Sequence, residues 1–362
     1  MGCQFYIKGV FMDLKCSNFN EMIKIIKKKR IICWGIGNYF DSFLDSVDKY
    51  INELNIVYLI DNNSHIRNKK KNINGKEVEV LSFERYLEVK QEQDTIIITT
   101  VHYNSIIEQI ENVNNSIEHL TYALIKHENL NDNIIIKRSE EKLIPPVIHY
   151  CWFGKGKMPQ KDREYVEGWK IKCPDYDVIC WSEDNFDINK NAFLSWAYKN
   201  KKWAFVTDYV RMYVLYKYGG IYLDTDVELL KNLDELRYQY AYMGMEESGC
   251  AASGLGMGTV ANNPIVKEIL DKYESIDSKE IENWKFYDVN AKRESDILRR
   301  YGFKANNQYQ IIEDIAIFPS EFFSPVQVGK KEMDITKNTF SIHHYHYSWL
   351  EEKEKQEIWK NN

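Results

Sequence analysis

The sequence has few cysteines, no long hydrophobic run and no excess of positive charge. None of its apolar stretches approaches the roughly 20 residues needed to cross a bilayer, and the N-terminus lacks a hydrophobic segment followed by a small-residue cleavage site. The 7 cysteines include no Cys-x-x-Cys pair, which is typical of free thiols in a reducing compartment. These absences predict a cytoplasmic protein.

Basic residues do not dominate the chain either. The 48 lysines and arginines are outnumbered by 54 aspartates and glutamates, giving a formal net charge of −6, which argues against a protein that coats nucleic acid. With 44% hydrophobic and 28% charged residues, the composition is that of a globular protein. A length of 362 residues suits two domains of ordinary size.

Residues 1–142 alternate between short apolar strands and amphipathic helices. The expected elements include strands at Ile31–Trp34, Ile56–Ile60 and Thr95–Thr100 and a helix at Tyr39–Leu54. This alternation favours a parallel sheet with helical crossovers, so we predict a small Rossmann-like α/β domain. Because Pro145 and Pro146 follow a polar segment and block a helix, we expect a second α/β domain at residues 143–362.

Gly35 and Gly37 follow the first of these strands, and Asp61 follows the second. Glycines in such a turn allow close approach to a phosphate, and the acid can bind a ribose hydroxyl, as in dinucleotide-binding domains. Phe40 stands where the full pattern has its third glycine. Two interpretations stay open for this pattern, a nucleotide site and an ordinary strand-to-helix turn.

Two aspartates lie one residue apart in Gly219–Leu230, which otherwise has the pattern of a buried strand. Helical periodicity over Ala192–Tyr218 precedes it, and alternation along the strand puts Asp224 and Asp226 on one face. Two carboxylates so close together need a counter-charge, and a hard divalent cation such as Mg²⁺ or Mn²⁺ supplies it. From spacing alone, a pair of solvated aspartates at a strand end is the alternative.

The segments Ala204–Arg211 and Gly219–Asp226 resemble the DXD sugar-binding region of the bacterial capsular and lipopolysaccharide glycosyltransferases of family 32. That family is related to yeast mannosyltransferases and, more distantly, to the clostridial glucosylating toxins. The resemblance runs from about Ile144 to Trp349. It implies that residues 143–362 form a GT-A-type, Rossmann-like nucleotide-sugar transferase domain, preceded by the smaller domain at 1–142.

The resemblance also implies roles for individual residues. The catalytic candidates are Asp208, Arg211, Asp224 and Asp226. The candidates for donor binding are Tyr150, Trp152, Phe153, Asp208, Arg211, Asp224, Ser348 and Trp349. Among these, Trp152 is the candidate for stacking on a uracil base.

The stretch Ser341–Trp349 holds three histidines and resembles the C-terminal His and Ser-Trp motif of the same family. We predict that His344 joins Asp224 and Asp226 as a ligand of Mn²⁺ or Mg²⁺, which accept oxygen and imidazole ligands. A surface histidine cluster beside a packing tryptophan is the alternative.

The glycines Gly254, Gly256 and Gly258 follow the aspartate strand. A glycine-rich segment allows close approach to backbone, so we expect a flexible wall on the acceptor side of the site. An ordinary loop is the alternative interpretation.

The function that the resemblance implies is a metal-dependent, retaining transfer of galactose, glucose or an N-acetylated hexosamine from a UDP-sugar. The expected acceptor is a saccharide or lipid-linked saccharide in surface polysaccharide synthesis, reached by peripheral association with the inner face of the plasma membrane. The first domain would dock a partner, form oligomers or bind nucleotide. Two rival functions are a non-catalytic nucleotide- or carbohydrate-binding protein and an NAD-linked sugar oxidoreductase that uses the Gly35–Gly37 turn.

Overall fold

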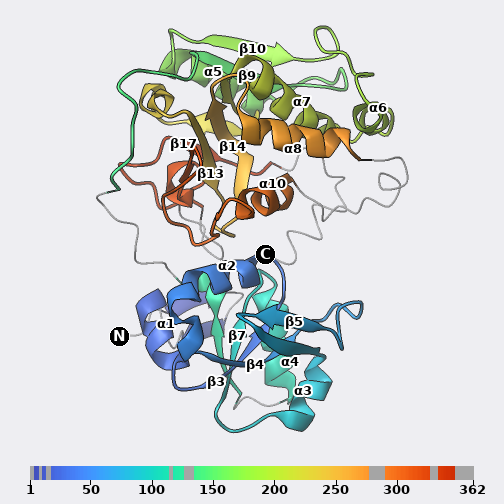
Figure 1. Ribbon diagram of the computed structural model, residues 1–362, viewed down its shortest axis with the longest axis vertical. Coiled ribbons are helices and arrows are strands. Elements are labelled where there is room, and N and C mark those ends of the chain that lie inside the picture. The colour runs from blue at the N-terminus through green and yellow to red at the C-terminus, as the bar shows by residue number, and fades with distance from the viewer. Residues whose placement is uncertain are drawn as a thin grey trace.

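Two separate sheets organise the chain, one in each lobe of the molecule (Figure 1). The structure is a computed structural model that describes residues 4–7, 10–13, 18–113, 117–125, 134–276, 290–326 and 333–346. The lower lobe carries the first sheet and α1–α4, and the upper lobe carries the second sheet, α5–α8 and α10. Helix α2 lies at the top of the lower lobe and α10 at the base of the upper one (Figure 1).

The first sheet has six strands in the order β5-β6-β4-β3-β7-β8. All neighbours pair in parallel except β5 with β6. The strands are β3 (Arg30–Trp34), β4 (Asn55–Ile60), β5 (Lys70–Ile73), β6 (Lys76–Leu81), β7 (Asp94–Ile98) and β8 (Glu118–Thr121). A separate antiparallel pair is formed by β1 (Gln4–Ile7) and β2 (Val10–Asp13).

Helices cover both faces of this sheet. The helices are α1 (Phe19–Ile26), α2 (Asn38–Val47), α3 (Phe83–Val89) and α4 (Tyr103–Val113). Alternate residues of β3 point to opposite faces, so Ile31 and Cys33 pack with α1 and α2, while Ile32 and Trp34 pack with α3 and α4. The predicted parallel α/β sheet is confirmed, with β3, β4 and β7 within two residues of the expected strands. The predicted helix at Tyr39–Leu54 was too long, since α2 gives way to a 3-10 turn at Asp48–Glu53.

The second sheet has seven strands in the order β10-β9-β11-β14-β13-β16-β15 and mixes parallel with antiparallel neighbours. Its strands are β9 (Val147–Cys151), β10 (Asp177–Trp181), β11 (Gly220–Tyr222), β13 (Ala241–Met245), β14 (Ala251–Thr259), β15 (Gln310–Ile312) and β16 (Ile315–Phe318). A small antiparallel sheet pairs β12 (Val227–Leu229) with β17 (Ser341–His343).

Helices also cover both faces of the second sheet. They are α5 (Gln160–Lys172), α6 (Ala192–Lys199), α7 (Trp203–Tyr218), α8 (Pro264–Glu274) and α10 (Asn290–Arg299). Trp169 of α5 belongs to one core cluster, while α6, α7 and α8 supply the other. The expected single helix at Ala192–Tyr218 is two helices, because Lys201 adopts a left-handed φ of 56° between them. No helix among the described residues is long and apolar enough to span a bilayer.

The segment just before Pro145 lies against the second domain. The carbonyl oxygen of Lys137 accepts a hydrogen bond from Gln239 Nε2 at 2.8 Å, and Ser139 Oγ donates to the carbonyl oxygen of Tyr238 at 2.8 Å. Ile134 and Ile136 also pack on the core of the second domain. Residues on the N-terminal side of the boundary expected near residue 142 therefore pack against the part of the chain that follows it.

Candidate functional site

The DXD aspartates lie in a turn between two sheets. Strand β11 ends at Tyr222 in the main sheet, whereas β12 begins at Val227 and pairs with β17. The expectation of one continuous strand was wrong, because the backbone leaves the main sheet after Leu223 and the carbonyl oxygen of Asp224 accepts a turn hydrogen bond from Val227 at 3.1 Å. The aspartates therefore stand just beyond the end of β11, where ligands commonly bind in α/β sheets.

Asp224, Asp226 and His343 form a group whose ligand atoms lie within 4.8 Å of one another. His343 Nε2 is 3.4 Å from Asp226 Oδ1 and 3.7 Å from Asp224 Oδ2. Burial opposes charging of this imidazole, but the carboxylates of Asp226 and Asp224 outweigh it and raise the pKa of His343. Two carboxylate oxygens and one imidazole nitrogen suit Mn²⁺, and also Mg²⁺ through the oxygens, so the residues fit a divalent cation.

His344, the predicted third ligand, points elsewhere. Its Nε2 lies 2.9 Å from Glu228 Oε2, and its ring stacks on Tyr165 with centroids 4.8 Å apart. The prediction is corrected by the observed contacts, since neighbouring residues of a strand face opposite ways and His343 Nε2 is the imidazole nitrogen that lies 3.4 Å from Asp226 Oδ1. His343 therefore faces the aspartates.

Arg211 connects the first aspartate of the motif to the interior. Its Nη2 donates to Asp224 Oδ1 at 2.8 Å and its Nη1 donates to Ser253 Oγ at 2.8 Å. Asp208, one helical turn earlier on α7, lies 3.6 Å from the same guanidinium. Tyr222 donates its hydroxyl to Asp224 Oδ1 at 3.0 Å when that carboxylate is ionised. The structure thus brings together the four predicted catalytic residues, Asp208, Arg211, Asp224 and Asp226.

The network extends to Glu294 on α10, a buried acid that belongs to no recognisable local sequence pattern. Glu294 accepts hydrogen bonds from the backbone nitrogen of Ser253 at 2.8 Å and from Ser253 Oγ at 2.6 Å. Burial raises the pKa of Glu294, and burial raises that of Asp208 to about 7 although Arg211 opposes the change. Arg211 therefore lies in the field of three carboxylates, those of Asp208, Asp224 and Glu294, and the positive charge of Arg293 also acts on Asp208.

A second buried acid that sequence reasoning missed is Asp162 on α5. Its Oδ2 accepts a hydrogen bond from Thr225 Oγ1 at 3.2 Å, and its Oδ1 lies 2.9 Å from His346 Nδ1. The backbone nitrogen of His346 in turn donates to Asp226 Oδ2 at 2.9 Å. Asp162 thus links the DXD turn to the segment after β17.

The glycines predicted to form a flexible acceptor wall belong to β14, a buried nine-residue strand. A Cβ on Gly254 would lie 2.4 Å from Asp224 Oδ2, and one on Gly258 would lie 2.3 Å from the ring of Tyr242. Gly256 has a φ of +141° and faces Leu223. The expectation of a flexible segment and the alternative of an ordinary loop were both wrong, because the three glycines lie in a strand where Gly254 and Gly258 make room for protein neighbours.

The predicted donor-binding aromatics have packing roles in the described structure. Tyr150 packs edge-on against Trp169 with centroids 5.7 Å apart, and Phe153 is buried in the core beside α7. Trp152 is half-buried and donates from Nε1 to the carbonyl oxygen of Gly156 at 2.7 Å. The remaining two predicted donor contacts, Ser348 and Trp349, lie outside the described residues.

In the first domain, both carboxylate oxygens of Asp61 are occupied by hydrogen bonds from backbone nitrogens. Asp61 Oδ2 accepts a hydrogen bond from the backbone nitrogen of Ile36 at 3.0 Å, and Oδ1 accepts one from Asn63 at 2.8 Å. Gly35 has a φ of +99°, and its Cβ position would lie 2.9 Å from Thr100. This geometry favours the interpretation as a strand-to-helix turn.

Comparison with known proteins identifies the segment around this site. Residues 159–243 match the family model described as "Glycosyltransferase sugar-binding region containing DXD motif". The matched segment contains Asp162, Asp208, Arg211, Asp224 and Asp226. The predicted resemblance to a DXD sugar-binding region is therefore matched over residues 159–243.

Curated relatives align over less than half of the chain. "Inositol phosphoceramide mannosyltransferase 2" of Schizosaccharomyces pombe is 30% identical over 165 residues, covering 41% of this chain and 43% of that protein. "Mannosyl phosphorylinositol ceramide synthase CSH1" of Saccharomyces cerevisiae is 28% identical over 150 residues, covering 38% and 37%. The chain therefore spans less than half the length of these relatives.

Solved structures align with part of this chain. "PaToxG Glycosyltransferase" aligns with a TM-score of 0.33 at 17% identity, over 43% of this chain and 68% of that chain. A glycosyltransferase involved in glycosylation of the major capsid of PBCV-1 aligns with a TM-score of 0.34 at 10% identity, over 60% of this chain and 100% of that chain.

Proposed function

We propose that this protein is a metal-dependent glycosyltransferase that moves a sugar from a nucleotide-diphosphate donor to a hydroxyl group. One observation carries the proposal: Asp224, Asp226 and His343 converge within 4.8 Å inside and beside the segment that matches the DXD sugar-binding region. Asp226, His343 and Asp224 would bind Mn²⁺ or Mg²⁺. When bound, the ion supplies positive charge for the diphosphate.

The residues around the aspartates provide a fixed positive charge and a hydrogen-bond acceptor in addition to the ion. Loss of a nucleoside diphosphate from the anomeric carbon leaves positive character on the sugar and negative charge on the leaving oxygen. Arg211 is fixed by Asp224 and Ser253, so its positive charge needs no reorganisation as that charge develops. Asp208, also beside Arg211, is placed to accept hydrogen bonds from sugar hydroxyls in its ionised form.

The proposed transfer retains anomeric configuration. The bond from the anomeric carbon to the phosphate oxygen breaks, the bond to the acceptor oxygen forms on the same face, and the acceptor proton passes to the leaving phosphate. Asp208 and Asp224 both lie beside Arg211, and the lowered pKa of Asp224 beside this guanidinium makes it a weak nucleophile, which supports this route over a covalent sugar on Asp224. Trapping a sugar on either carboxylate would contradict it.

The donor and acceptor belong to the same proposal. We propose UDP as the nucleotide and galactose, glucose or an N-acetylated hexosamine as the sugar. Mannose joins the candidates because the names of the yeast relatives describe mannose transfer to inositol phosphoceramide. Those names also support a saccharide or lipid-linked acceptor. We place the reaction in the cytoplasm at the inner face of the membrane, in surface polysaccharide synthesis.

The experiment that tests the proposal measures nucleoside diphosphate release from a panel of UDP-hexoses, UDP-N-acetylhexosamines and GDP-mannose. Each donor is incubated with Mn²⁺ or with a chelator, with and without simple saccharide acceptors. We expect release from one donor that the chelator abolishes. Donor binding without release anywhere in the panel would favour the non-catalytic binding protein, and ultraviolet absorbance of a co-purified nicotinamide would favour the oxidoreductase.

A further inference from the structure

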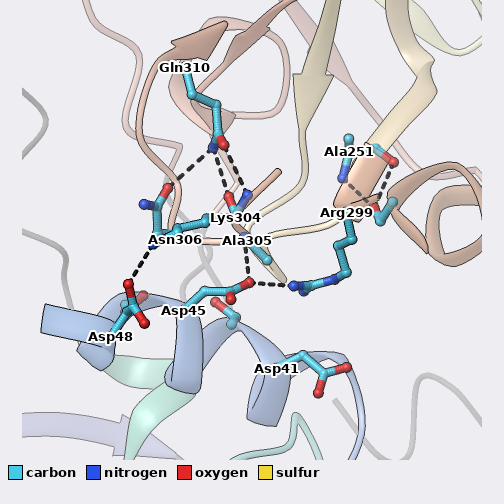
Figure 2. Close-up of polar contacts among 12 residues, drawn as sticks. Asp41, Asp45, Asp48, Ala251, Arg299, Lys304, Ala305, Asn306 and Gln310 are labelled. Carbon is cyan, nitrogen blue, oxygen red and sulfur yellow. Dashed lines mark hydrogen bonds and ion pairs between the residues drawn. The ribbon is translucent and has the colours of Figure 1, made fainter. Parts of the chain in front are cut away.

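The first domain contacts the second through a carboxylate on α2 (Figure 2). Asp45 Oδ2 lies 2.6 Å from Arg299 Nη1 and accepts a hydrogen bond from the backbone nitrogen of Ala305 at 2.8 Å. Arg299 is the last residue of α10, and Ala305 lies in the loop that follows this helix. The side chains of Asp45 and Arg299 are only 20% and 29% exposed, so this ion pair is partly shielded from solvent.

The other end of the contact lies against the candidate site, because α10 also carries Glu294 and Ser295. Glu294 binds both the backbone nitrogen and the hydroxyl of Ser253. Ser295 Oγ accepts a hydrogen bond from the backbone nitrogen of Ala251 at 2.9 Å. Helix α10 therefore connects the ion pair at its C-terminal end with two positions of β14.

Strand β14 connects α10 with Asp224, the first aspartate of the DXD motif. Ser253 Oγ accepts the hydrogen bond from Arg211, and Arg211 donates to Asp224. The next residue, Gly254, lies so close to Asp224 Oδ2 that a Cβ would be 2.4 Å away. A displacement of α10 would therefore move both the partner of Arg211 and the backbone beside Asp224.

A second contact joins α2 to the turn before β14. Gly249 has a φ of +83°, and its Cβ position would lie 2.9 Å from Ser42 Oγ and 2.5 Å from the carbonyl oxygen of Ala305. The β13–β14 turn thus fits closely between α2 and the loop after α10. Both elements that lead to Ser253 contact the same helix of the first domain.

Two further aspartates on α2 and just beyond it provide internal comparisons (Figure 2). Asp41 pairs with Lys71 at 3.1 Å, within the first domain. Asp48 pairs with Lys304, in the loop after α10, and both side chains are about half exposed, at 58% and 48%. Of these three aspartates, Asp45 is the one with a described contact to α10 itself.

We propose that Asp45 is a positioning residue for the DXD site. Its ion pair with Arg299 fixes α10, and α10 through Glu294 and Ser295 fixes β14 and the Arg211–Asp224 pair. The first domain then contributes to the geometry of the Arg211–Asp224 pair. The kinetic consequence rests on the proposed function, whereas the structural consequence does not.

The test compares Asp45→Asn with Asp48→Asn and Asp41→Asn in the full chain. Asparagine can still accept the hydrogen bond from Ala305 but loses the ion pair with Arg299, so the substitution isolates the contact with α10. We expect hydrogen exchange at the amides of Ala251 and Ser253 to accelerate about tenfold in Asp45→Asn and to stay at the wild-type rate in both controls. Arg299→Gln should reproduce the change, and the double variant should add little to it.

Kinetics supply the second readout. With the donor identified, Asp45→Asn should lower kcat about three- to tenfold with little change in KM, because the Arg211–Asp224 geometry matters most as charge develops. Unchanged exchange and unchanged kcat would overturn the proposal. So would uniform acceleration of all amides without an excess at Ala251 and Ser253. Selective exchange in a protein that turns over no donor would refute the proposed function and leave the positioning role intact.

Discussion

Asp61 in the first domain and Asp226 in the second each follow a strand that pairs in parallel with a neighbouring strand. The surroundings of the two carboxylates nevertheless differ. Both oxygens of Asp61 accept backbone hydrogen bonds from Ile36 and Asn63. Asp226 instead lies beside His343 and Asp224, where ligand atoms of three side chains converge. A carboxylate whose two oxygens both accept backbone hydrogen bonds stabilises the turns that donate them. Carboxylates that converge without such donors favour the binding of a cation.

The same contrast holds for buried charge. The buried Asp94 of the first domain pairs with Arg30 at 3.4 Å and also accepts a hydrogen bond from Gln91. In the second domain, Arg211 forms ion pairs with both Asp208 and Asp224. It is also linked through the hydroxyl of Ser253 to Glu294. Substitutions in the site should therefore change metal binding and turnover, whereas a substitution at an internally satisfied carboxylate should change stability alone.

The largest effect is expected from His343→Ala. Loss of this imidazole should weaken Mn²⁺ binding by about 100-fold or more, since even residues that only orient a metal ligand contribute 10–100-fold. His344→Ala is the matched control, because His344 contacts Glu228 and Tyr165. Calorimetric titration with Mn²⁺ measures both. Equal losses for the two variants would contradict the placement of His343 in the site.

Gly254→Ala should have the next largest effect. The added Cβ would lie 2.4 Å from Asp224 Oδ2, so Asp224 must move away from Arg211, and we expect kcat/KM to fall roughly tenfold. Gly37→Ala in the first domain is the control, since no atom lies within 4 Å of its Cβ position. Wild-type turnover in Gly254→Ala would show that the placement of Asp224 is not critical.

Asp208→Asn should change the pH dependence of stability. Burial raises the pKa of Asp208 to about 7, so the folded state binds this proton more tightly than the unfolded state. The stabilisation is complete below about pH 4 and is lost as the pH rises through about 7. Asparagine stays neutral, so the stability of the variant relative to wild type should rise across this interval. Denaturant unfolding with a chelator present measures it, and parallel curves would contradict the pKa.

The smallest effect on turnover is expected from Asp61→Asn. The amide keeps one acceptor oxygen but loses the second, which weakens the turn by about 1 kcal/mol. Because Asp61 is internally satisfied, kcat and KM should match those of wild type. Thermal unfolding and donor turnover on the same preparation separate the two quantities. A clear kinetic loss would revive the nucleotide-site interpretation of the Gly35–Gly37 turn.

Periodicity in the sequence predicted the α/β layers and several strands because local patterns determine them. The strands β3, β4, β9 and β10 all show short apolar runs bounded by turn residues. The break after Leu223 was missed because the apolar alternation continues through it, with Ile221, Leu223 and Val227 all buried. Period-two alternation alone cannot show that a chain changes sheet.

The candidate site was only partly predictable for a related reason. Asp208, Arg211, Asp224 and Asp226 form a recognisable local pattern, whereas Glu294 and Asp162 are single acids in helices and carry no such signal. The choice between His343 and His344 depends on the register of β17, which no local pattern reveals. Glycines in β14 suggested a loop, although their role is to admit neighbouring side chains.

The most direct test of the central claim is nucleoside diphosphate release by metal-stripped protein before and after Mn²⁺ is restored, for wild type and Asp226→Asn. Asparagine keeps the size of the side chain and removes its charge, so the fold is retained while the charged ligand is lost. We predict that Mn²⁺ restores turnover in wild type and that the turnover rate of the variant stays at least about 100-fold below the wild-type rate. Comparable restoration in both proteins, or turnover that ignores the metal, would contradict it.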